Sequence, residues 1–354
     1  MDTLSTRQTE ALPYVRIWLF AIAFLIFCMV IVGGATRLTG SGLSITEWQP
    51  LLGIIPPLTE TGWQTAFGKY QLIPEYSAVN QGMTLAQFKY IYWWEWSHRF
   101  LGRFIGAAFL LPFVFFTATG RLPRPLWPRL AAIFVLGGLQ GALGWYMVAS
   151  GLVDRTEISQ YRLSAHLSLA ALIFGATFWL AVGLKGRRHS PSGGHELIAL
   201  LIVALLLLQI SVGGFVAGLD AGQGYNTWPL MDGKLVPDGL FAMEPLWRNI
   251  FENAMTVQFN HRLLAYVIAV FVAGYAWVVR TREPIVLLVT VLAQIAFGIW
   301  ALLGQVPLWL GLVHQAGAFA VLTAALWNLH CALSGEAKSN ISAVLSRGSG
   351  SSQL

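Results

Sequence analysis

The pentapeptide Glu95-Trp96-Ser97-His98-Arg99 decides the fold, because it returns in altered form as Gln258-Phe259-Asn260-His261-Arg262. Each copy is followed, two apolar segments later, by a further histidine, His166 after the first and His314 after the second. The repeated order of motifs predicts two halves built on one scaffold. Glu95 has no acidic counterpart, since Gln258 stands at its position, so we expect the halves to differ in their task.

The composition predicts an integral membrane protein. Hydrophobic residues make up 56% of the 354 residues and charged residues only 11%, and the mean hydropathy is +0.63. The net charge of +6 indicates topology and no nucleic acid, because Lys and Arg gather between apolar runs. Cys28 and Cys331 lie in apolar runs far apart in sequence, so neither a disulfide nor a CxxC motif is expected.

Eight apolar runs are each about as long as the roughly 20 residues that cross a bilayer as a helix. They lie at about 14–36, 91–118, 128–148, 163–184, 196–218, 257–279, 284–303 and 310–333. The short loops after the second, fourth and sixth runs are basic, with Arg121, Arg124, Arg129, Lys185, Arg187, Arg188, Arg280 and Arg282. The positive-inside rule places these loops and both termini in the cytoplasm. On the opposite side Arg155 and Arg162 are offset by Asp154 and Glu157.

The polar N-terminus carries Asp2 and Glu10 and lacks the character of a mitochondrial transit peptide. We therefore expect a multi-pass protein of the bacterial inner (plasma) membrane.

Self-comparison supports a duplication. Gly33-Gly34, Gly42 and Trp48 match residues 180 positions later, and the offset falls to 163 at His98/His261, 154 at Gln140/Gln294 and 148 at His166/His314. We predict an all-α protein of two tandem four-helix bundles, 1–190 and 191–354, related by a pseudo-twofold axis along the membrane normal. The external loops 37–90 and 219–256 are expected to cover the two halves, with Trp48 and Trp228 packed equivalently.

The four repeated histidines are the candidate ligands. His98, His166, His261 and His314 are expected one to two turns inside helices that run inward from the external face. An ionisable side chain at this depth indicates function, and two facing imidazoles per half suit the iron of a haem. A helix-to-helix hydrogen bond is the ordinary role of a single such histidine. A zinc or copper site would need further Cys or carboxylate ligands, which the motifs do not supply.

Glu95 precedes His98 by one helical turn and lies on the same helix face. It could accept a proton or stabilise positive charge beside a haem edge. The alternative is structural, an ion pair with Arg99 or a favourable charge in the first turn. Haem propionates would seek guanidinium partners, although each candidate could equally extend to the interface; the candidates are Arg37, Arg99, Arg103, Arg162 and Arg262. Gly33-Gly34 and Gly137-Gly138 are expected to allow close helix contact.

These motifs resemble a known family. The run Gly33-Gly-Ala-Thr-Arg-Leu-Thr-Gly-Ser-Gly-Leu-Ser-Ile-Thr-Glu-Trp48, with Pro50, Ile55-Pro56-Pro57, Glu95-x-x-His-Arg and the paired histidines, is similar to haem A synthase. The resemblance covers about residues 14–333. Because no cysteine pair stands in the external loops, the chain resembles the cysteine-free subgroup typical of proteobacteria and mitochondria.

The resemblance implies an eight-helix membrane oxidoreductase that converts the substrate haem O to haem A for terminal oxidases. By position, it implies that His98 and His166 hold the substrate haem, that Glu95 is catalytic, and that His261 and His314 ligate a haem b cofactor. It also leaves open contact with a haem O synthase or oxidase assembly factors, and a homo-oligomer. The electron donor is not specified.

Two other classes of function compete. A di-haem b-type electron-transfer protein would need haems at both membrane faces, whereas both histidine pairs are expected near one face. Parallel repeats also occur in transporters, but the runs show no pair of broken central segments.

Overall fold

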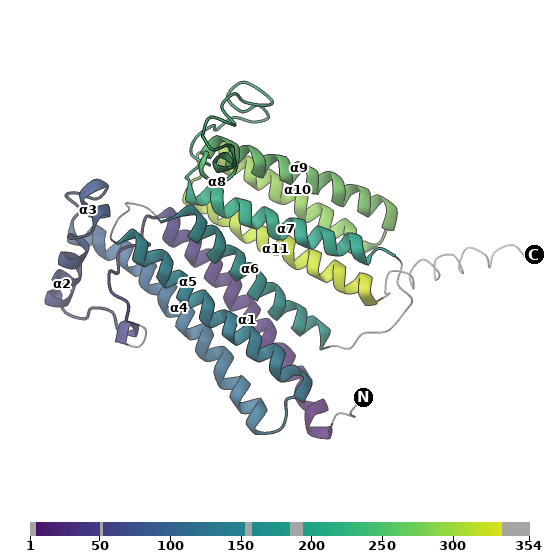
Figure 1. Ribbon diagram of the computed structural model, residues 1–354. Coiled ribbons are helices and arrows are strands. Elements are labelled where there is room, and N and C mark those ends of the chain that lie inside the picture. The colour runs from purple at the N-terminus through teal and green to yellow at the C-terminus, as the bar shows by residue number, and fades with distance from the viewer. Residues whose placement is uncertain (1–4, 50–51, 153–157, 185–193, 335–354) are drawn as a thin grey trace, which may run out of the picture.

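The computed structural model describes residues 5–49, 52–152, 158–184 and 194–334, and within them the chain is helical, without a strand. Eight helices in this part are long and apolar enough to cross a membrane, as expected from the sequence (Figure 1). They are α1 (Thr6–Leu38), α4 (Leu85–Ala118), α5 (Trp127–Gly151), α6 (Gln160–Gly183), α7 (Glu196–Gly218), α9 (Ala254–Val279), α10 (Arg282–Leu303) and α11 (Leu308–Ser334). The chain is thus a multi-pass membrane protein.

The eight helices group as two sets of four (Figure 1). Helices α1, α4, α5 and α6 form the first set, and α7, α9, α10 and α11 the second. The first and last helix of each set meet at the seam, where α1 packs on α11 and α6 packs on α7. Helix α7 corresponds to α1 in the repeat and α11 to α6. These contacts are compatible with the expected pseudo-twofold axis.

Helix starts and ends follow local sequence signals. Ser5 with Gln8, and Thr84 with Gln87, form capping boxes at the starts of α1 and α4. After α1, Gly40 takes a positive φ of 61° that suits glycine. The residue 180 positions later is Asp220, which follows α7 with a φ of 48°. The duplicated backbone turn is therefore retained even where its glycine has been replaced.

The external connections differ between the halves. The first contains η1 (Leu52–Ile54), α2 (Glu60–Tyr70) and α3 (Pro74–Ala78), whereas the second has only η3 (Leu246–Arg248) and α8 (Asn249–Glu252). Helices α2 and α3 pack on the outer end of α4 through buried side chains that include Trp63, Phe67, Tyr70, Phe88 and Tyr92. We call α2, α3 and this outer end of α4 the external cap. It stands apart from the main bundle in Figure 1.

Several expectations differ from the structure. Helix α4 begins at Leu85, not near residue 91, because its outer end belongs to the external cap. A methyl group at Gly137 or Gly138 would meet nothing within 4 Å, so the expected close contact there is wrong. Trp48 packs on Trp145 of α5, while Trp228 donates a hydrogen bond to Tyr266 of α9, so these two do not pack equivalently.

Two further expectations concern the cysteines and the boundary between the halves. Cys28 and Cys331 form no disulfide within the described residues. The boundary between the proposed halves, at 190/191, lies outside the described residues, as do Pro50, Asp154, Arg155, Glu157, Lys185, Arg187 and Arg188.

Candidate functional site

Each of the four candidate histidines lies against a glycine of a neighbouring helix. A methyl group built on Gly33 of α1 would be 3.2 Å from the His98 ring, and one on Gly213 of α7 would be 3.2 Å from the His261 ring. Similarly, a methyl group on Gly144 of α5 would be 3.0 Å from the His166 ring, and one on Gly298 of α10 would be 2.7 Å from the His314 ring. The glycines repeat with the same offsets as the helices that carry them. Both halves therefore leave space for an imidazole where any other residue would crowd it.

The paired histidines of the second half lie close together. The rings of His261 and His314 have centroids 6.4 Å apart. A metal–imidazole bond of about 2.0 Å on each side, plus about half a ring at each end, spans roughly 6 Å. His98 and His166 stand at the corresponding positions of the first half, each against the matching glycine. No group of three or more His, Cys, Asp or Glu in the described part of the chain could hold a metal ion directly. Paired imidazoles without further ligands fit the iron of a haem.

Two glutamines support the second histidine of each pair. Gln140 of α5 donates from Nε2 to the backbone oxygen of His166 at 3.0 Å, and Gln294 of α10 does the same to His314 at 2.7 Å. The Oε1 atoms of both glutamines and the Nδ1 atoms of both histidines are buried and have no hydrogen-bond partner among the described residues. An iron-ligating imidazole usually donates its other N–H to a nearby acceptor. In each half, one glutamine Oε1 can therefore still accept a hydrogen bond, and the Nδ1 of the histidine that this glutamine supports can still donate one.

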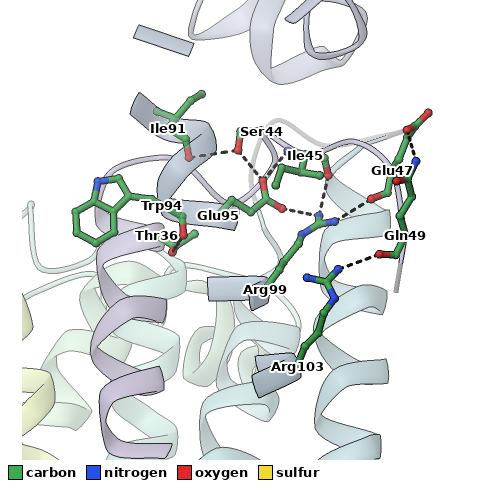
Figure 2. A network of polar contacts seen from close by, with 10 residues as sticks. All are labelled: Thr36, Ser44, Ile45, Glu47, Gln49, Ile91, Trp94, Glu95, Arg99 and Arg103. Atoms are coloured by element: carbon green, nitrogen blue, oxygen red, sulfur yellow. Dashed lines mark hydrogen bonds and ion pairs between the residues drawn. The ribbon is translucent and has the colours of Figure 1, made fainter. Parts of the chain in front are cut away.

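Glu95 is 2% exposed and is held by three donors (Figure 2). Its Oε2 atom accepts hydrogen bonds from the Ser44 hydroxyl at 2.7 Å and the Ile45 backbone N–H at 2.6 Å. Its Oε1 atom pairs with Nη2 of Arg99 at 2.5 Å. The ion pair with Arg99, which is the structural role considered for Glu95, is therefore formed. The same contacts fix the carboxylate in one orientation, a requirement for a group that acts on developing charge.

Arg99 and Arg262 fasten the two external connections by the same pattern. Arg99 donates to the backbone oxygens of Ile45 at 2.7 Å and Glu47 at 2.8 Å. Arg262 donates to the backbone oxygens of Tyr225 and Thr227, both at 2.9 Å. Tyr225 and Thr227 lie 180 positions after Ile45 and Glu47. The duplication thus extends to individual hydrogen bonds at the site.

Gln258 takes over the structural part of the role of Glu95. Its Oε1 accepts from Nη2 of Arg262 at 2.9 Å, as the carboxylate of Glu95 accepts from Arg99. Its Nε2 donates to the backbone oxygens of Ala221 at 2.6 Å and Gly224 at 3.2 Å. Holding the arginine and the external connection therefore does not require a negative charge. The charge that distinguishes Glu95 is an additional feature of the first half.

The remaining candidate arginines also have protein partners. Arg103 donates to the backbone oxygen of Gln49 at 2.9 Å (Figure 2). Arg162 donates to the backbone oxygen of Tyr146 at 2.8 Å and lies 3.8 Å from the centre of its ring. Arg37 crosses between the halves and pairs with Asp220 at 2.6 Å. A propionate would have to share these guanidinium groups with the protein.

Four residues that shape the histidine pairs were missed as site residues by sequence reasoning. Gln140 and Gln294 stand out in the sequence only as markers of the repeat, and Gly144 and Gly298 are ordinary glycines of apolar runs. Gly144 follows Gln140 by four residues and Gly298 follows Gln294 by four, so each pair lies on one helix face. The common offset of 154, which relates Gln140 to Gln294 and Gly144 to Gly298, was the sequence signal that could have identified them.

Known proteins match most of the chain. A family model described as cytochrome oxidase assembly protein, COX15-CtaA, matches residues 16–326. A protein named Heme A synthase from Parvibaculum lavamentivorans is 55% identical over 318 residues, covering 88% of this chain and 92% of that protein. Proteins of the same name from Chelativorans sp. and Nitrosospira multiformis are 52% and 49% identical; the alignments cover 87% and 89% of this chain, and 88% and 92% of those proteins. The chain therefore belongs to the COX15-CtaA family of cytochrome oxidase assembly proteins.

Proposed function

We propose that the chain is a haem A synthase, a membrane oxidoreductase that oxidises a porphyrin methyl group of haem O to the formyl group of haem A. The observation that carries this proposal is the asymmetry of an otherwise duplicated site. Both halves present two histidines, each against a glycine, but only the first adds the carboxylate of Glu95. The names of the relatives support the same activity.

The two halves then take different haems. His98 and His166, in the half 1–190, would hold the substrate haem O. His261 and His314, in the half 191–354, would hold a haem b that relays electrons. Bound haem would supply the redox chemistry, and the two histidines of each half would hold its iron. Arg37, Arg99, Arg103, Arg162 and Arg262 remain the proposed propionate partners, because they surround the external ends of the same helices.

Glu95 would act only on the haem that is held in the first half. Ser44, Ile45 and Arg99 hold its carboxylate in place, so no reorganisation is needed when positive charge develops at the methyl carbon. A carboxylate in this position can also accept a proton released by the oxidation. We place this site toward the periplasmic side of a bacterial inner membrane, with both termini in the cytoplasm, on the distribution of basic loops.

Pigment analysis tests the proposed function. The purified protein, expressed in cells that make haem O but have no haem A synthase of their own, should contain haem b together with haem O or haem A, and the cells should accumulate haem A. A preparation that binds only haem b in cells without haem A would favour the electron-transfer alternative.

Ligand variants test the assignment of the two halves. His261→Ala or His314→Ala should remove haem b. The matched variants His98→Ala and His166→Ala should keep haem b and lose haem O. A normal low-spin haem b spectrum in both His261→Ala and His314→Ala would refute the assignment.

A further inference from the structure

A second buried carboxyl group lies in the external cap. Glu75 of α3 is 9% exposed and takes part in no ion pair among those of the described residues. The hydroxyl of Tyr70 donates to its Oε2 atom at 3.3 Å, and Asn80 in turn donates to the Tyr70 hydroxyl at 2.7 Å. A buried carboxylate without a cation is costly, whereas the neutral acid needs only hydrogen bonds. The cap thus holds an acid whose surroundings favour its protonated form.

The pKa of Glu75 depends on three other groups as well as on burial: Tyr70 of α2, Glu95 of α4 and Arg37 of α1. Burial, opposed by the hydrogen bond from Tyr70, raises the pKa of Glu75 from 4.5 to about 7. The charge of Glu95 raises that pKa further and the charge of Arg37 lowers it. Burial also raises the pKa of Tyr70, so its hydroxyl stays a donor at neutral pH. Tyr70 packs on Phe88 of α4, and the same cluster includes Tyr92, one helical turn before Glu95. Glu75 is therefore a buried acid in a cap that adjoins Glu95.

The second half offers no equivalent acid among its described residues. Its external connection lacks helices like α2 and α3. Three of its five acids form ion pairs and the other two are exposed; the paired acids are Asp220, Asp238 and Glu252, and the exposed ones are Asp232 and Glu244. A buried acid without a cation partner is therefore found in the half that also carries Glu95. This coincidence links the acid to the chemistry of the first half and not to the shared scaffold.

We propose that Glu75 is a positioning residue that couples the charge at Glu95 to the external pH by binding and releasing a proton in the cap. The inference rests on the proposed function. Release converts the Glu75 carboxylic acid to a carboxylate and passes one proton to external water, with no change in oxidation state. The added negative charge strengthens the negative potential around Glu95 and favours positive charge developing on the substrate. Oxidation of haem O should therefore speed up as the pH rises through about 7.

The first experiment follows the carboxyl group itself and needs no bound haem. Infrared difference spectra of the purified protein between pH 5 and 9 should show a protonated carboxyl band that titrates near pH 7. Glu75→Gln should lack this band. Glu60→Gln is the matched control, because Glu60 is an exposed acid of the same cap that pairs with Lys89. A band that persists in Glu75→Gln would overturn the proposal.

The second experiment measures haem A formation against pH. Glu75→Gln should hold the slow rate of the wild type at low pH and lose the rise near pH 7. Tyr70→Phe should move the rise to higher pH, because the Tyr70 hydrogen bond lowers the pKa of Glu75. Glu60→Gln should follow the wild type.

Three outcomes separate the possible failures. An unchanged pH profile in Glu75→Gln would refute the coupling and leave the proposed function standing. Absence of haem A with wild-type protein would refute the proposed function, and the coupling with it, although the infrared titration would still report Glu75. A Glu75→Gln protein that fails to fold while Glu60→Gln folds would also contradict the proposal, since glutamine reproduces the neutral acid.

Discussion

The glycine beneath His314 gives the sharpest test of the paired-histidine sites. In Gly298→Ala the new methyl group would lie 2.7 Å from Cε1 of His314, about 0.7 Å short of the 3.4 Å where ordinary contact begins. The imidazole ring is rigid and packed between helices, so the ring or helix α10 must shift by about that amount. Metal ligands tolerate displacements of only about 0.2 Å. We expect the affinity for haem b to fall about 10-fold to 100-fold, as for other changes that misplace a ligand.

Two other glycines provide matched comparisons. Gly213→Ala would place a methyl group 3.2 Å from the His261 ring, so a small shift suffices and most haem b should remain. Gly274→Ala on α9 meets nothing within 4 Å and should be neutral. All three substitutions favour the helical state by up to about 1 kcal/mol, so loss of helix stability cannot explain a difference between them.

The assay is the ratio of haem b to protein after purification, together with the low-spin visible spectrum and the thermal unfolding midpoint. Haem b should be lost in Gly298→Ala, largely kept in Gly213→Ala and unchanged in Gly274→Ala. A full complement of haem b with a native spectrum in Gly298→Ala would refute the argument that this glycine makes room for an iron ligand.

Two further predictions concern the acids of the first half. In Glu95→Gln the amide oxygen can still accept from Arg99, as Gln258 does from Arg262, but the NH2 group would face the Ile45 N–H, so we expect the external connection to lose about 1–3 kcal/mol of stability. The variant should keep haem b, and conversion should stall at haem O or a partly oxidised product. Substantial haem A in a pigment analysis would contradict a catalytic Glu95. For Glu75, the folded pKa of about 7 lies above the 4.5 expected when unfolded, so its stabilising contribution is complete below pH 4.5, is lost as the pH rises and is absent above about 7. Glu75→Gln removes this dependence. Between pH 5 and 8 the free energy of unfolding of the variant, measured from unfolding midpoints, should therefore rise relative to that of the wild type by at most about 3 kcal/mol. Equal midpoints of the two proteins at both pH values would contradict this prediction.

The helices could be predicted from the sequence because the membrane imposes a simple rule. A span needs about 20 apolar residues with its backbone bonds satisfied internally, and eight runs meet that condition. The same runs carry the repeated motifs in constant order, and this order alone is enough to single out the four histidines. The glycines beneath these histidines repeat as well, at offsets of 180 for Gly33/Gly213 and 154 for Gly144/Gly298, so this part of the site is encoded in the sequence too.

The contacts of the polar side chains could not be predicted in the same way. Arg99 and Arg262 bind backbone oxygens of the external connections, and a backbone oxygen carries no signature in the sequence. The burial of Glu75 depends on aromatic side chains from α2 and α4 that meet only in the folded cap. Along the chain, Glu75 is one acid in a polar loop. The expected contacts at Gly137 and Gly138 failed for a related reason, because a helix pattern does not show which face meets a neighbour.

The exchange of Glu95 for Gln258 reverses the direction of its hydrogen bonds to the external connection, and the residues of that connection differ to match. Glu95 accepts from the hydroxyl of Ser44, whereas the residue 180 positions later is Gly224, which offers only its backbone oxygen to Gln258. Gln258→Glu alone would turn a carboxylate toward the oxygens of Ala221 and Gly224, at an expected cost of at least about 2 kcal/mol.

Adding a hydroxyl should recover part of that loss. Gly224 has open space around it, so Gly224→Ser fits and can donate to the introduced carboxylate as Ser44 does to Glu95. We expect Gly224→Ser alone to be nearly neutral and the double variant to be about 1–2 kcal/mol more stable than the sum of the single changes, a coupling typical of residues in contact. Unfolding midpoints and haem b content of the four proteins measure this coupling. Additive effects would show that the two positions did not diverge as a pair, and that the difference between the halves rests on Glu95 alone.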